Sequence, residues 1–226
     1  MVVPGKAKAV SRRDDGGHLA LDFVNTLDWR DRAQPVERLA EWPELLDWLR
    51  RVRVLGAREA KTLAREGHSA PRRAAAHFRA ALRLREASSR LFRAWLGHRA
   101  ADPADLALLN ARLRRRPQIR ELAASGADYV WRRAREDSAP ALLLGILAEA
   151  TAELLTAPEL RRLRLCEGGG CGWLFLDLSP NRSRRWCSME SCGNRAKARR
   201  HYARRREAAE GGPAARAGRR LRGRRR

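Results

Sequence analysis

Four cysteines within 27 consecutive residues constrain this chain more than any other feature of its sequence. Four residues separate Cys166 from Cys171, four separate Cys187 from Cys192, and fifteen lie between the two pairs. Each pair can close a short loop around one ion, and two such loops supply the tetrahedral shell of four thiolates that Zn²⁺ accepts. Glycines at 168–170 permit a tight turn within the first pair. The spacing therefore predicts one Zn²⁺ bound by all four cysteines.

The alternative for these cysteines is a pair of disulfides, which depends on the cellular compartment. The N-terminus has no apolar stretch of the signal-peptide type, and the longest apolar run, residues 141–148, is far below the roughly 18 residues of a membrane span. We therefore expect a soluble, cytoplasmic protein with no membrane partner. In a reducing compartment, clustered cysteines are more often metal ligands than disulfides. A closed shell of four thiolates leaves no position for a catalytic water, so the expected role of the zinc is structural.

Charge is concentrated in the same part of the chain. The 226 residues carry 49 Lys plus Arg against 26 Asp plus Glu, a formal net charge of +23. Residues 161–226 hold 20 of the basic and only 5 of the acidic side chains. This excess predicts a polyanionic partner.

A change of composition near Pro158 marks the expected domain boundary. We expect a flexible leader over 1–15, a helical domain over 16–157, a zinc finger over 158–209 and a disordered basic tail over 210–226. The tail is rich in Arg and has no apolar periodicity, so it cannot bury enough surface to offset its ordering entropy.

Apolar residues at spacings of three and four predict a mainly α N-terminal domain. In the first expected helix Leu19, Phe23 and Leu27 share one face. Further helices are expected around Pro43 and over 58–65, 71–96, 103–113 and 141–155, the last one apolar on most sides and hence central. Alternation through Ile119, Leu122, Tyr129 and Trp131 around Ser125 and Gly126 predicts a small β-hairpin.

The cysteine-rich segment predicts a treble-clef-like finger: a knuckle, a β-hairpin and a helix. Residues 172–179 are expected to form one strand and residues 184–187 a second strand that returns to the metal. A helix should start at Gly193 or Asn194, with Asn194 more often an N-cap than a base contact in such a position. Trp173 and Trp186 are expected to be core residues beside the metal.

Basic side chains cover most of the circumference of this last helix, and alanines leave room to approach a groove. Arg195 lies nearest the zinc site and is the candidate for a base contact, whereas the other arginines suit phosphates. The candidate nucleic-acid-binding residues are Arg195, Lys197, Arg199, Arg200, Arg204, Arg205 and Arg206. The alternative is a solvated basic helix with no specific partner.

About forty residues from Cys166 onward, including the tetrad Cys192, Gly193, Asn194 and Arg195, resemble the CGNR zinc finger. The preceding part, with LALDFVNTLDW near its start, resembles the ABATE domain that commonly precedes this finger. The resemblance implies a bacterial stress-induced transcription regulator whose finger binds DNA.

Three functional hypotheses follow: a zinc-dependent DNA-binding regulator, an RNA-binding or ribosome-associated protein, and a ligand- or partner-binding protein with a structural finger. The helical domain could sense a small-molecule effector, form a homodimer or bind another protein. Asp22, Asn25 and Trp29 form a polar cluster that is a candidate ligand pocket. We expect no catalysis, because the five His are scattered and no phosphate-binding glycine loop is present.

Overall fold

Helices form most of the chain that the computed structural model describes, which is residues 16–114, 120–125, 128–133 and 139–210. The expected leader over 1–15 and nearly all of the expected tail, residues 211–226, lie outside the described residues. The chain divides into two units, one up to Cys187 and one from Ser188, and each is described by itself. No helix of the described part is both long and apolar enough to cross a membrane.

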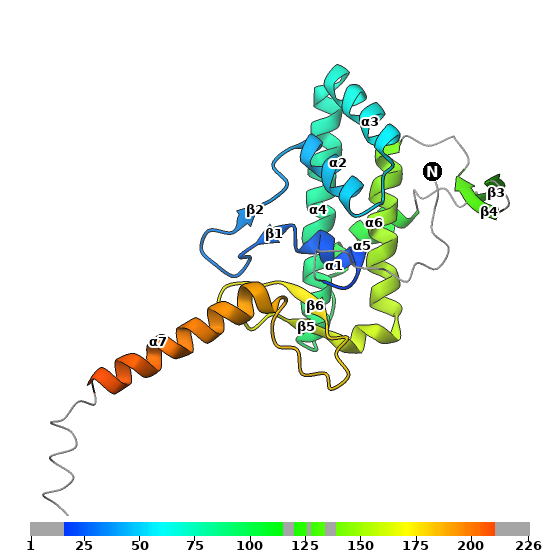
Figure 1. Ribbon diagram of the computed structural model, residues 1–226. Helices are drawn as coiled ribbons and strands as arrows, with labels where there is room; N and C mark the ends of the chain where they lie inside the picture. The colour runs from blue at the N-terminus through cyan, green and yellow to red at the C-terminus, as the bar shows by residue number, and fades with distance from the viewer. Residues whose placement is uncertain (1–15, 115–119, 126–127, 134–138, 211–226) are drawn as a thin grey trace, which may run out of the picture. The chain divides into compact units, whose positions relative to one another are not determined.

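The first unit is built on two long helices, α4 and α6, with shorter helices against them (Figure 1). Its helices are α1 (Leu19–Val24), α2 (Trp42–Arg51), α3 (Ala57–Ser69), α4 (Pro71–Leu96), α5 (Pro103–Leu113) and α6 (Ala139–Thr156), followed by the 3₁₀-helix η1 (Pro158–Arg162).

Local signals set most helix bounds. Proline stands in the first turn of α2, α4 and α5, where its missing N–H costs nothing. The side chain of Asp102 caps α5 by accepting a hydrogen bond from the Ala104 amide at 2.8 Å. These signals are visible in the sequence, and α4 and α5 have the predicted bounds. Helix α3 is longer than predicted, since it continues to Ser69, two residues before Pro71.

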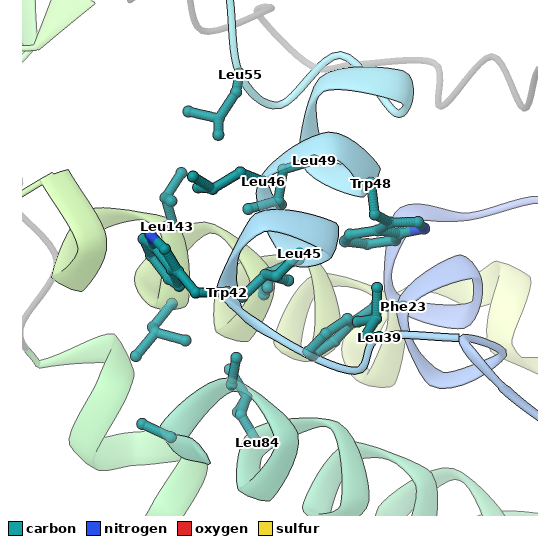
Figure 2. Close-up of a cluster of buried hydrophobic side chains, with 14 of the residues drawn as sticks. Phe23, Leu39, Trp42, Leu45, Leu46, Trp48, Leu49, Leu55, Leu84 and Leu143 are labelled. Carbon is teal, nitrogen blue, oxygen red and sulfur yellow. The ribbon is translucent and has the colours of Figure 1, made fainter. Parts of the chain in front are cut away.

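The main hydrophobic core lies where α2 packs on α4 and α6 (Figure 2). Leu45 and Leu49 of α2 are almost fully buried, as is Leu84 of α4. The rings of Phe23 and Trp48 lie 5.4 Å apart and join α1 to this core. The apolar residues predicted for α2 and α4 are therefore mostly buried, but Trp95 of α4, also expected in that set, is 36% exposed.

A second core cluster joins the start of the helical region to the cysteine-rich segment. It combines residues of α1, α4, α6 and η1 with Leu163 and Leu174, which belong to the strands β5 (Leu163–Leu165) and β6 (Leu174–Leu176). All three side chains of β6 are buried. The residues on the two sides of Pro158 thus share one core.

Helix α1 is shorter than the predicted helix, because it ends before Asn25, whose side chain binds the backbone of β6. The side-chain amide of Asn25 donates to the Leu174 carbonyl at 2.8 Å and accepts from the Leu174 amide at 3.0 Å. Leu27 therefore lies outside the helix and belongs to β1 (Leu27–Asp28), which pairs with β2 (Val36–Glu37). Leu27 has helical spacing from Leu19 and Phe23 in the sequence only by coincidence.

A buried ion-pair network fixes β2 on α4. Arg85 is only 3% exposed and donates to both carboxylate oxygens of Glu37, at 2.7 and 2.6 Å, and also to Thr26 and Glu86. Glu86 also pairs with Arg30. Every charge in this group has a partner, as buried charges require.

Of the two longer hairpins, one has the strand pairing that the sequence predicts and the other does not. The predicted hairpin around Ser125 is present as β3 (Arg120–Ser125) and β4 (Asp128–Arg133), paired antiparallel with Leu122 opposite Trp131. In the finger, β6 is the predicted strand, but its partner is β5 and not residues 184–187, which form no strand. The prediction of that second strand was wrong, because the hairpin closes around the first cysteine pair.

We expect Asn25→Ala to lower the free energy of unfolding by about 2–4 kcal/mol. The substitution leaves both the N–H and the C=O of Leu174 buried without a partner, and each such group costs about 1–3 kcal/mol. Urea denaturation followed by circular dichroism measures the change. Asn110→Ala, at an exposed position on α5, is the control and should stay within about 0.5 kcal/mol. A loss no larger than that of the control would show that the amide pairing is dispensable.

We also expect stability to fall as the pH drops below the ordinary His pKa of 6.5, through His18. His18 caps α1, because its Nδ1 accepts from the Ala20 amide at 3.2 Å, and an imidazolium has no lone pair there. Burial lowers the pKa of His18, against a smaller opposing effect of Glu159. A lowered folded-state pKa gives stability that is present above 6.5 and is lost on acidification. His18→Asn, a cap that does not titrate, should flatten the melting temperature between pH 7 and pH 5; an unchanged slope would refute the role of His18.

Candidate metal centre and basic helix

The first cysteine pair lies in the loop between β5 and β6. Cys166 follows β5 directly, and its amide donates to the Trp173 carbonyl at 2.9 Å. The Cys171 amide donates to the Gly168 carbonyl at 2.8 Å and closes the turn. Gly170 and Gly172 have φ of +74° and +70°, a conformation that side chains disfavour. The strand pair and the glycines together form the knuckle expected for these residues.

The second cysteine segment is tied to this knuckle. The Glu167 amide donates to the Arg185 carbonyl at 3.0 Å, and the two side chains form an ion pair of 2.5 Å. The Cys187 amide donates to the Cys166 sulfur at 3.3 Å. Amide donation to a ligand sulfur is a typical outer-shell contact of a thiolate metal site.

All four cysteines are buried, unbridged and clustered. Their sulfur atoms lie within 4.8 Å of one another, and those of Cys171 and Cys187 are 3.8 Å apart. A tetrahedron with Zn–S bonds of about 2.3 Å has S···S edges of about 3.8 Å. The donor set therefore fits zinc, and the four cysteines form a potential zinc site. None of them forms a disulfide in the structure.

Electrostatics explains why this cluster needs a cation. The hydrogen bond from Cys171, followed by that from Cys187, lowers the pKa of the Cys166 thiol. The same hydrogen bonding with Cys166 raises the pKa of Cys171 and of Cys187, which keep their protons. Among Cys166, Cys171 and Cys187 the bare cluster thus favours a single thiolate. A divalent cation lets all four ionise and couples its binding energy to folding.

The second unit, which starts at Ser188, carries the last cysteine and continues as one long helix. A π-helical turn η2 (Met189–Gly193) carries Cys192 and leads directly into α7 (Asn194–Glu210). A Cβ at Gly193 would lie 2.7 Å from the Met189 sulfur, so a larger residue here would require the Met189 side chain to move. The helix starts at Asn194, as predicted.

Asn194 and Arg195 each have a local partner in this turn. The Asn194 side chain donates to the Glu190 carbonyl at 3.2 Å. Since it donates where an N-cap accepts, and the helical turn η2 precedes it, the N-cap prediction for Asn194 was wrong. The guanidinium of Arg195 donates to the Cys192 sulfur at 3.0 Å.

The rest of α7 presents charge to solvent. The residues from Lys197 to Glu207 are all exposed, and Tyr202 is 65% exposed. The seven candidate nucleic-acid-binding residues all lie on this helix and are all exposed: Arg195, Lys197, Arg199, Arg200, Arg204, Arg205 and Arg206. Over residues 197–207, where burial is described, the helix therefore buries no apolar face.

Of the candidate ligand residues, Asp22 and Asn25 come together and Trp29 does not join them. Asp22 and Asn25 line a cavity of about 30 Å³, room for one or two waters. Asp22 accepts a hydrogen bond from the Gly16 amide, and the side-chain amide of Asn25 donates to the Leu174 carbonyl. Trp29 does not line this cavity, and the Arg32 guanidinium lies 3.5 Å above its ring. These residues therefore build structure around the cavity.

Two arginines that sequence reasoning missed hold the knuckle from the helical side. Arg93 of α4 donates to the Gly172 carbonyl at 2.9 Å, and the Arg30 amide donates to the Cys171 carbonyl at 3.2 Å. Arg93 also pairs with Asp31 at 3.0 Å. No sequence pattern indicates these contacts, because Arg93 is 79 residues away from its partner Gly172 along the chain.

Comparison with known families agrees with this arrangement. Residues 162–205 match the CGNR zinc finger. Residues 17–158 match the ABATE family, described as "Putative stress-induced transcription regulator". Neither description is that of an enzyme. A search of curated proteins finds no match. The ABATE match alone spans more than half of the 226 residues, and the chain therefore belongs to the ABATE family, with a CGNR zinc finger following the ABATE domain.

Proposed function

We propose that this protein is a bacterial transcription regulator that binds DNA through a zinc-dependent finger, and whose N-terminal domain senses a ligand or a partner. The observation that carries the proposal is the exposed basic helix α7, which begins two residues after the last cysteine of the cluster. The regulator description of the matching family supports the same role.

In this proposal one Zn²⁺ is held by Cys166, Cys171, Cys187 and Cys192 and has a structural role. Four sulfur ligands close its shell, so the metal does no chemistry on a substrate. It fixes the turn from which α7 starts. The outer-shell donors include the Cys187 and Gly168 amides, on the Cys166 sulfur, and the Arg195 guanidinium, on the Cys192 sulfur.

The proposed nucleic-acid contact is made by α7. A helix of 17 residues is about 25 Å long and fits the major groove of DNA. Arg199, Arg200 and Arg204 are exposed and suit phosphate oxygens, which give affinity without sequence information. Arg195 is the candidate for a base contact, because it is the basic residue nearest the N-terminus of α7 and the cysteine cluster; its guanidinium would have to bind the base in addition to the Cys192 sulfur.

We expect about one zinc per chain in protein purified without added metal, measured by elemental analysis. Cys187→Ser should reduce the zinc content to well below half and lower the melting temperature of the whole first unit, because β5 and β6 share a core with its helices. Structural zinc contributes about 10–16 kcal/mol in finger peptides.

Ser191→Ala, between the last two cysteines, is the matched control and should keep both the zinc and the melting temperature. A zinc content near zero in the reduced wild-type protein would contradict the proposed site. So would full zinc retention by Cys187→Ser.

We expect the triple variant Arg199→Gln/Arg200→Gln/Arg204→Gln to bind duplex DNA much more weakly than the wild type. If each side chain neutralises one phosphate, the slope of log K against log salt should become smaller by about 2.7. Fluorescence anisotropy titrations at several salt concentrations measure both quantities.

The control for this variant removes the same charge from another helix. Arg72→Gln/Arg79→Gln/Arg83→Gln changes three exposed arginines of α4 and should leave the salt slope nearly unchanged. Equal losses in the two triple variants would mean that only the total charge of the chain matters. Tighter binding of single-stranded or structured RNA than of duplex DNA would favour an RNA-binding protein and overturn the proposal.

A further inference from the structure

A cavity of about 530 Å³ opens on the first unit among α2, α3, α4 and the start of α6. Apolar side chains line it, among them Trp42, Leu63 and Ala74, together with the polar Arg73 and His77. Its volume lies in the range of about 300–1,000 Å³ that is usual for small-molecule sites. It is distinct from the small cavity beside Asn25 and contains none of the residues that sequence reasoning selected for a pocket.

One wall of the cavity is a rigid aromatic surface. Trp42, only 8% exposed, is the first residue of α2, and its ring nitrogen donates to the carbonyl of Leu63 in α3 at 3.4 Å. The imidazole of His77 lies 6.2 Å from the indole, tilted by 40°. A Cβ at Gly67 would lie 2.7 Å from the indole, so glycine lets α3 approach the ring this closely. A preformed aromatic wall suits a flat apolar ligand.

The electrostatic potential at the α4 side of the cavity is positive. Burial lowers the pKa of His77, and Arg73 and then Arg112 lower it further, with no acid acting in the opposite direction. His77 is therefore neutral at pH 7. Glu66 lines the cavity from α3, but it neither pairs with Arg73 nor raises the pKa of His77.

Arg73 is the charged group available to a ligand. It is exposed on the first turn of α4, and among the described residues no carboxylate lies within ion-pair distance of its guanidinium. One guanidinium beside a neutral imidazole balances one negative charge, which suits a carboxylate better than a doubly charged phosphate.

We propose that this cavity binds a small aromatic carboxylate, with the ring against Trp42 and the carboxylate paired with Arg73. The regulatory meaning of such a ligand rests on the sensing role proposed above. The binding itself is independent of DNA.

The test is isothermal titration of the full-length protein at 150 mM salt with naphthalene-2-carboxylate and with its neutral analogue naphthalene-2-carboxamide. We expect saturable one-to-one binding of the carboxylate and at least tenfold weaker binding of the amide. Arg73→Gln should weaken binding of the carboxylate about tenfold and leave that of the amide unchanged. Arg72→Gln removes the same charge from the adjacent exposed residue, which does not line the cavity, and should bind both probes as the wild type does.

A second variant tests the place of binding. Ala74→Leu fills the cavity from α4 and should abolish binding of both probes, and a thermal melt shows whether the variant is folded. Three results would overturn the proposal: no saturable binding of the carboxylate, equal affinity for acid and amide, or equal effects of Arg73→Gln and Arg72→Gln. None of these bears on the DNA titrations, so this inference can fail while the proposed function stands.

Discussion

The pairing of the Asn25 side chain with the backbone of Leu174 is the contact on which the arrangement of the first unit depends. It ends α1, fixes β6 against that helix and satisfies two buried backbone groups at once. The hairpin that carries the first cysteine pair is thereby anchored in the core of the helical region. Leu163, Leu174 and Leu176 complete this anchor, because they lie in the same cluster as the residues of α1 and α6.

The knuckle is consequently held from two directions. Arg30 and Arg93 bind the backbone carbonyls of Cys171 and Gly172, and each belongs to an ion-pair group, with Glu86 and with Asp31 respectively. A change in the helical region around α4 would act on the same loop that supplies a proposed zinc ligand. These contacts join the helical region to the loop that carries the first cysteine pair.

Arginine has two separate roles in this chain. Arg85 is buried, and its planar fork binds both oxygens of Glu37, a geometry that Lys cannot reproduce. On α7 the arginines are exposed, and in the described residues of that helix acids are few. A high total charge alone could not distinguish these roles. Burial and ion-pair partners make the distinction.

The sequence by itself determined the features that rest on local chemistry. Prolines and Asp102 set the starts of helices, apolar spacing selected the buried faces of α2, α4 and α6, and the spacing of the cysteines predicted their cluster. Only the tertiary structure decided that Asn25 leaves its helix for Leu174, that β5 and not residues 184–187 pairs with β6, and that Trp42, Arg73 and His77 surround a cavity. These features depend on contacts between residues that are far apart in the chain. Which of those contacts form is determined by how the whole chain packs, and no local sequence pattern indicates it.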